Sequence, residues 1–194
     1  MTVCFGIAQR VCDGEIVCGD AYVTQLLHDG ALVSVVDGLG HGPKAGEAAI
    51  AFTDMLAEDE AVGVGVEALM EEANRRLAGT RGAAAAILRV DESAHRVQFT
   101  GVGNIEMHAV SDVKMHPVCA PGIVGHRVRK LLSFEFELPA AAVIALCSDG
   151  ISSRLHLDHY AHLEPQEMAD AIMEHHGKSH DDATCVIVRY TNEA

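Results

Sequence analysis

Tryptophan is absent from this 194-residue sequence, and aromatic residues make up only 4% of it. Because 49% of the residues are hydrophobic, the core must be built mainly from aliphatic side chains and alanine. Long apolar runs are also missing: residues 83–88 and 139–147 are far shorter than the roughly 20 residues that span a bilayer. The N-terminus has no basic segment ahead of an apolar block, so it does not resemble a signal peptide. We expect a globular protein without a membrane segment.

Basic residues are scarce, with 14 Lys and Arg against 28 Asp and Glu and a formal net charge of −14. This balance argues against nucleic-acid binding through a general basic surface. The negative charge has two possible sources. One is an acidic, solubilising surface, and the other is a cluster of carboxylates offset by bound cations. Composition alone does not divide the charge between them.

The six cysteines include no CxxC pair. Cys4, Cys18, Cys147 and Cys185 lie in apolar, strand-like runs, where reduced cysteine behaves as a small hydrophobic residue. The sequence therefore favours a reduced, cytoplasmic protein.

No internal repeat, low-complexity segment or linker divides the chain, so residues 1–194 are expected to form one domain. The patterns predict strands at residues 3–10, 15–18, 21–27, 31–36, 82–90, 96–102, 131–138, 142–147 and 184–190. They predict one helix that begins at Pro43, a second at about residues 64–77 and a third at about residues 165–176. Strands come in hairpins and helices come in pairs or alone, which favours an α+β fold of antiparallel sheets covered by helices.

The dipeptide Asp-Gly occurs four times. At 13–14 and 29–30 it is explained by a hairpin turn between two strands. At Asp37 and Asp149 a buried-looking strand ends on the aspartate and no partner strand returns at once. The loop 38–43 is also too rich in glycine for a simple connection, and close glycines let carbonyls and water approach an ion. We therefore predict functional carboxylates at Asp37 and Asp149.

Two further acidic sites lie at strand ends: Asp20 follows one short apolar run, and Asp181-Asp182 leads into the final strand. Carboxylates gathered at one place repel one another strongly without cations. Hard divalent ions such as Mg²⁺ and Mn²⁺ prefer oxygen ligands, and two of them can act together on a phosphoryl displacement. The residues themselves therefore indicate a centre with two metal ions.

In their order along the chain, VVDGLGHG, LCSDGI and HDDATCVIV resemble the metal-dependent PPM (PP2C-like) serine/threonine phosphatases. The DGxGHG form, preceded by Gly19-Asp20, is most similar to the sporulation stage II E branch. Since the sequence shows no sensor or partner-binding domain, it looks like the stand-alone RsbX type of that branch. The resemblance implies an αββα sandwich, in which two mainly antiparallel sheets are flanked by helices. It also implies two Mn²⁺ or Mg²⁺ ions and a flap at about residues 115–130.

The same resemblance implies a set of metal ligands. They are Asp37, which would bridge both ions, the carbonyl of Gly38, Asp20 at the second ion, and Asp149 and Asp181 at the first. Asp181 is preferred to Asp182 because the family's ligand lies three residues before a Thr or Ser, here Thr184.

Two positions depart from the family pattern. Asn104 stands where many members have an aspartate that helps to bind a third ion, and an amide is a poorer ligand for a hard cation, so a third site is not expected. The family often has a phosphate-binding arginine shortly before the first metal-binding aspartate, but residues 14–19 contain none. Arg10, Arg127 and Arg129 are candidates among which the sequence does not discriminate.

The implied reaction is hydrolysis of phosphoserine or phosphothreonine by a hydroxide that bridges the two metal ions. His41 could help to protonate the departing alkoxide, or it could simply be a polar residue of the glycine loop. Ser148 has no nucleophile elbow around it and is interpreted as structural. The other histidines lack the spacing of a zinc site and are interpreted as surface residues.

The RsbX type resets the bacterial stressosome by dephosphorylating its STAS-domain proteins, so these are the implied partners. No nucleic acid and no membrane are expected to bind. Two alternatives stay open, a catalytically inactive module with the same fold and a two-metal phosphodiesterase. The acidic charge disfavours the phosphodiesterase, and the retention of all four aspartates disfavours the inactive module.

Overall fold

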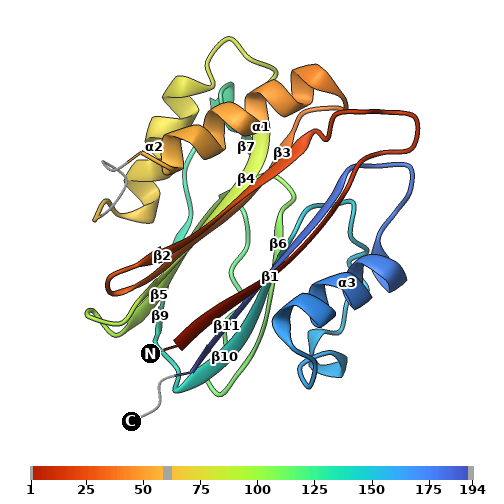
Figure 1. Cartoon of the computed structure of the whole chain (residues 1–194). Helices are drawn as coiled ribbons and strands as arrows, with labels where there is room; N and C mark the ends of the chain where they lie inside the picture. The colour runs from red at the N-terminus through yellow and green to blue at the C-terminus, as the bar shows by residue number, and fades with distance from the viewer. Residues whose placement is uncertain (1, 59–62, 192–194) are drawn as a thin grey trace.

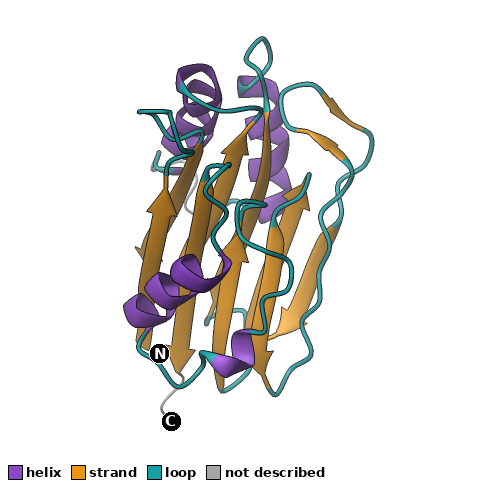
Figure 2. Cartoon of the chain, turned by 90° about the vertical axis from the view of Figure 1, so that its right-hand side faces the viewer, coloured by secondary structure: helices purple, strands orange, loops and turns teal. Residues whose placement is uncertain are grey.

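The computed structural model describes residues 2–58 and 63–191. Two β-sheets pack face to face, with two helices on the outer face of one sheet and a third helix on the outer face of the other (Figures 1 and 2). The strands are β1 (Thr2–Arg10), β2 (Asp20–Leu27), β3 (Gly30–Gly38), β4 (Ala83–Asp91), β5 (Arg96–Val102), β6 (Glu106–Ser111), β7 (Gly122–Ile123), β8 (Arg127–Val128), β9 (Ser133–Glu137), β10 (Ala141–Cys147) and β11 (Ala183–Thr191). The helices are α1 (Pro43–Leu56), α2 (Val66–Arg76), α3 (Pro165–His176) and the short 3-10 helix η2 (Leu157–His159).

One sheet has the strand order β2-β3-β4-β5-β9 and the other has the order β1-β11-β10-β6. All neighbouring strands in both sheets are antiparallel. The predicted αββα sandwich is therefore confirmed. Within the described residues, no helix is long and apolar enough to cross a membrane.

Strand alternation explains how aliphatic residues fill three apolar layers. In β3, Val33 and Val35 point into the core between the sheets, while Leu32 and Val36 face α1 and α2. Every residue of β4 is buried, because both faces of this central strand are covered. On the outer face of the second sheet, α3 packs through Met168 and neighbouring apolar residues. The two sheets are therefore held in a fixed relation, and so are the residues at their ends.

The expected strand at residues 15–18 is wrong. β1 pairs with β11 from the far end of the chain, with Arg10 opposite Ala183, and it forms no hairpin with the segment that follows it. The Asp13-Gly14 turn does form, since the Glu15 amide donates to the Cys12 carbonyl at 3.0 Å. Because β1 and β2 belong to different sheets, residues 11–19 are the connection that passes from one sheet to the other.

The sequence patterns also missed β6, which pairs with β10 at the edge of its sheet. In the region expected to form a flap, β7 and β8 make a small hairpin. The Gly125 amide donates to Asn74 Oδ1 at 2.9 Å, which ties this hairpin to α2.

Candidate metal centre

Strand pairing brings the four predicted aspartates to one end of the sandwich. Asp20 and Asp37 are directly opposite each other where β2 begins and β3 ends. In the other sheet β10 pairs with β11, and the Ser148 amide donates to the Thr184 carbonyl at 3.0 Å. Asp149 lies just after β10 and Asp181 lies just before β11, so both lie at the same end of this strand pair. In Figure 1 this end lies opposite the chain termini, where the loop after β1 runs beside the loop before β11. Both sheets therefore contribute carboxylates.

Ser148 connects the two sheets at this point. Its hydroxyl donates to Asp20 Oδ2 at 2.7 Å and accepts the Thr184 amide at 2.9 Å. Gln9 Nε2 lies 3.2 Å from both the Asp20 carbonyl and Thr184 Oγ1. The orientation of Asp20 therefore depends on groups from the opposite sheet, and the structural role expected for Ser148 agrees with these contacts.

Asp181 and Asp182 have different surroundings. Asp182 is 2% exposed, and its two carboxylate oxygens accept the backbone amides of Cys12 at 2.9 Å and Gly19 at 2.8 Å. Asp182 thus fixes the crossing segment 11–19. Asp181 is only half-buried, and its Oδ1 accepts the amide of Asp182 at 3.0 Å. Of the two, Asp181 has the freer carboxylate.

Burial and mutual repulsion raise the pKa values of these carboxyl groups. The pKa of Asp37 is raised to about 8, by burial first and then by the charges of Asp20, Asp149 and the two aspartates before β11. Burial raises the pKa of Asp20 to about 7, although the hydroxyls of Ser148 and Thr184 partly oppose the change. The pKa of Asp149 is also raised, by burial and then by Asp181. Bound cations would remove this repulsion.

The donor set fits hard divalent ions. Asp20 Oδ1 is buried and has no hydrogen-bond partner among the described residues. A Cβ at residue 38 would lie 2.0 Å from the Ala45 carbonyl oxygen, so only glycine allows α1 to approach the end of β3 so closely. Across the described residues, no group of three or more His, Cys, Asp or Glu side chains is arranged to hold a metal ion by itself. Mg²⁺ and Mn²⁺ need none, because they bind through few carboxylates and keep several waters.

Two side chains hold Asp149. Asn104 Nδ2 donates to Asp149 Oδ2 at 2.7 Å, so this amide acts as a hydrogen-bond donor to the carboxylate. Lys178 Nζ donates to the Asp149 carbonyl oxygen at 2.5 Å, and the Lys178 amide donates to the Gly150 carbonyl at 2.8 Å. Sequence reasoning missed Lys178. In the sequence Lys178 is marked only as a basic residue shortly before HDDAT. Its contact with Asp149 arises because the chain after α3 packs beside the end of β10.

His41 lies at the rim of the same end of the sandwich. Its Nδ1 is 2.6 Å from Glu15 Oε1, and its side chain is 63% exposed. Glu15 was also missed, because the segment 15–18 was interpreted as a strand. The carboxylate fixes one ring nitrogen and leaves Nε2 on the other side of the ring.

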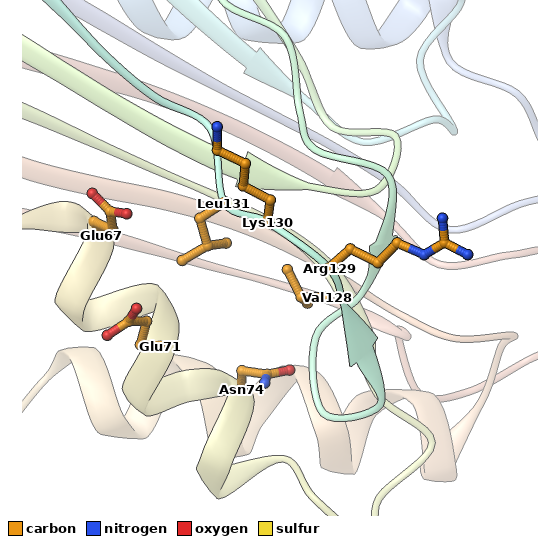
Figure 3. Close-up of a pocket in the computed structure, with 7 residues that line it drawn as sticks. All are labelled: Glu67, Glu71, Asn74, Val128, Arg129, Lys130 and Leu131. Carbon is orange, nitrogen blue, oxygen red and sulfur yellow. The ribbon is translucent and has the colours of Figure 1, made fainter.

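Of the three arginines considered for phosphate binding, Arg10 lies apart from Arg127 and Arg129. Arg10 NH2 lies 2.9 Å from where a Cβ on Gly177 would be, at the end of α3, and two of its nitrogens are buried without partners. Arg127 lies in β8 of the small β7–β8 hairpin, and Arg129 follows this strand. A groove of about 370 Å³ lies between this segment and α2. Figure 3 shows the residues that line it, with Arg129 extending away from the helix.

Comparisons with known proteins give one family and several similar structures. The family model for stage II sporulation protein E (SpoIIE) matches residues 28–191. Phosphoserine phosphatase RsbX of Bacillus subtilis (strain 168) is 23% identical over 180 residues, which cover 90% of this chain and 88% of that protein. A solved chain described under "The bacterial stressosome: a modular system that has been adapted to control secondary messenger signaling" is 31% identical, with a TM-score of 0.91 over 97% of this chain and 100% of that one. RsbX in complex with magnesium has a TM-score of 0.85 at 20% identity, over 96% and 94% of the two chains.

Proposed function

This chain belongs to the stage II sporulation protein E family, and from that premise we propose that it is a metal-dependent protein serine/threonine phosphatase. It removes phosphate from phosphoserine or phosphothreonine on a partner protein. The observation that carries the proposal is the set of mutually repelling carboxylates at one end of the sandwich, with a buried Asp20 oxygen that lacks a hydrogen bond.

We propose two Mn²⁺ or Mg²⁺ ions at this end. The residues that would hold them are Asp20, Asp37, the carbonyl of Gly38, Asp149 and Asp181. When bound, the ions would supply a nucleophilic water near neutral pH and positive charge for the phosphoryl oxygens. The association of a related RsbX structure with magnesium supports the choice of a divalent ion.

The surrounding residues have orienting and proton-transfer roles in this proposal. Ser148 orients Asp20, while Asn104 and Lys178 hold Asp149. Glu15 engages Nδ1 of His41, so the proton for the departing seryl or threonyl oxygen would come from Nε2. No protein nucleophile is required.

We further propose that the substrate is a phosphorylated protein of a stressosome, with STAS-domain components as the specific targets. The similarity to RsbX and to the solved stressosome-related chain supports this choice. We place the enzyme in the cytoplasm, because its six free thiols, including the exposed Cys4, persist in a reducing compartment.

The test is the release of phosphate from a phosphoserine STAS-domain protein with and without Mn²⁺. We expect activity that depends on Mn²⁺. Asp37→Ala and Asp149→Ala should each reduce it more than about a hundredfold, since even partners of metal ligands are worth about 10- to 100-fold. Activity in the presence of a chelator, or activity unaffected by both substitutions, would contradict the proposal.

A further inference from the structure

Arg81 lies beside the glycine loop that follows Asp37. It precedes β4, whose pairing with β3 places Ala83 opposite Gly38. The Leu39 amide donates to the Gly82 carbonyl at 2.9 Å, so the two chain segments stay together beyond the end of the strands. Arg81 NH1 lies 3.0 Å from where a Cβ on Gly40 would be. A guanidinium group therefore lies directly against this loop.

Gly40 also lies beside the segment that leads into Asp20. Its carbonyl oxygen lies 3.3 Å from where a Cβ on Gly19 would be, and Gly19 immediately precedes Asp20. A single glycine thus separates the guanidinium of Arg81 from the segment that carries Asp20. An arginine side chain is long enough to reach past Gly40 toward the segment that carries Asp20.

Hydrogen bonds hold the backbone of Arg81 in place but leave its side chain unbound. His126 Nε2, from the flap, lies 3.0 Å from the Arg81 carbonyl and 3.1 Å from the Thr80 carbonyl, and it donates to these acceptors. The Arg81 side chain is exposed and has no hydrogen bond or ion pair with any described residue. It lines an open groove of about 380 Å³ together with Lys44, Glu47 and the turn at residues 79–80. The groove provides space for a substrate chain.

Three other cations are less suited than Arg81 to bind phosphate. The Lys178 ammonium donates to the Asp149 carbonyl. Arg10 lies at the end of α3 with buried nitrogens. Arg129 follows β8 and extends away from α2 (Figure 3). Arg81, in contrast, lies against the loop that follows Asp37.

We infer that Arg81 binds the phosphoryl group of the substrate from the side of the glycine loop, in a chain that has no arginine in residues 14–19. This inference rests on the proposed function. The ligand class is a phosphate monoester dianion, whose oxygens can accept two parallel hydrogen bonds from a guanidinium. The protein groups around the proposed metal ions are carboxylates, which repel this dianion, so a guanidinium beside them would add to its binding.

The experiment measures the affinity of the Mg²⁺-loaded protein for inorganic phosphate by calorimetry and the KM for a phosphoserine peptide. Arg81→Ala should weaken phosphate binding about tenfold or more and raise KM by a similar factor. Arg81→Lys should recover part of the loss, because an ammonium retains the charge but not the paired donors. Mg²⁺ affinity and the melting temperature should stay unchanged.

Arg75→Ala, on the exposed face of α2, is the matched control, and Arg127→Ala and Arg129→Ala test the competing arginines. The inference is overturned if Arg81→Ala stays within about twofold of the wild type, or if a flap substitution alone causes the loss. A wild-type protein that releases no phosphate from any phosphoprotein would contradict the proposed function instead. The calorimetric comparison would still decide whether Arg81 binds phosphate.

Discussion

The pair formed by Glu15 and His41 shows how one residue can gain a role from another that is distant in sequence. Glu15 comes from the connection between the sheets, and His41 comes from the glycine loop 26 residues later. A carboxylate 2.6 Å from Nδ1 orients the imidazole ring. Without this contact, His41 is only an exposed polar residue.

At the residue scale we predict that Glu15→Gln lowers kcat for a phosphoserine peptide several-fold. The seryl alkoxide is a poor leaving group and needs a proton, whereas nitrophenolate does not. Hydrolysis of p-nitrophenyl phosphate should therefore change little. In a His41→Ala background, Glu15→Gln should have no further effect. Equal losses with both substrates would show that Glu15 acts only through structure.

The approach of α1 to β3 positions the loop that begins at Asp37. Pro43 provides the first helical residue, and Ala45, Ala48 and Ala49 are small enough to let the helix lie close to the sheet. The closest point is Gly38, where no side chain is tolerated. Helix packing and the position of the proposed carbonyl ligand are therefore set by the same contact.

At the element scale we predict that Gly38→Ala lowers the free energy of unfolding by about 1–3 kcal/mol, because the new methyl group displaces the first turn of α1. Mn²⁺ affinity should fall in the same variant. Urea denaturation and calorimetry measure the two effects. Gly65→Ala is the control, since nothing lies within 4 Å of its added Cβ and its φ is −66°. If Gly38→Ala behaves like Gly65→Ala, the packing argument is wrong.

Over the whole molecule, the carboxylate cluster makes the fold of the metal-free protein sensitive to pH. The folded-state pKa values of Asp20 and Asp37, about 7 and 8, lie above the ordinary aspartate value of 3.8. Their contribution to stability is therefore fully present only below pH 4 and is lost as the pH rises through 7 and 8. Divalent cations would favour the ionised forms and remove this loss.

We therefore predict that, in the presence of a chelator, the free energy of unfolding falls by about 1 kcal/mol or more between pH 7 and 8.5. Saturating Mg²⁺ should flatten this dependence. Asp37→Asn should flatten it in the chelator alone and should stabilise the metal-free protein at pH 8.5. Urea denaturation at several pH values measures these changes. A profile that is the same with chelator and with Mg²⁺ would exclude the cluster as its cause.

Local patterns in the sequence predicted antiparallel sheets covered by helices and placed the key aspartates at strand ends, while the family resemblance of the motifs implied the αββα sandwich. Asp37 and Asp149 could be singled out because an apolar run that stops at Asp-Gly is a feature of adjacent residues. Asp181 and Asp182 were both visible because they directly precede an apolar run. Only the structure showed that both carboxylate oxygens of Asp182 accept hydrogen bonds from the backbone amides of Cys12 and Gly19.

The tertiary structure alone decided the pairing of β1 with β11, and this decision changed the meaning of residues 11–19. Once that segment crosses between sheets, Glu15 reaches His41 and Gly19 reaches Asp182. Lys178 and Arg81 likewise acquire their roles from neighbours 29 and about 40 residues away along the chain. Such contacts depend on how separate elements pack. The periodicity of a single element indicates its type and its buried face, but not which distant element it packs against.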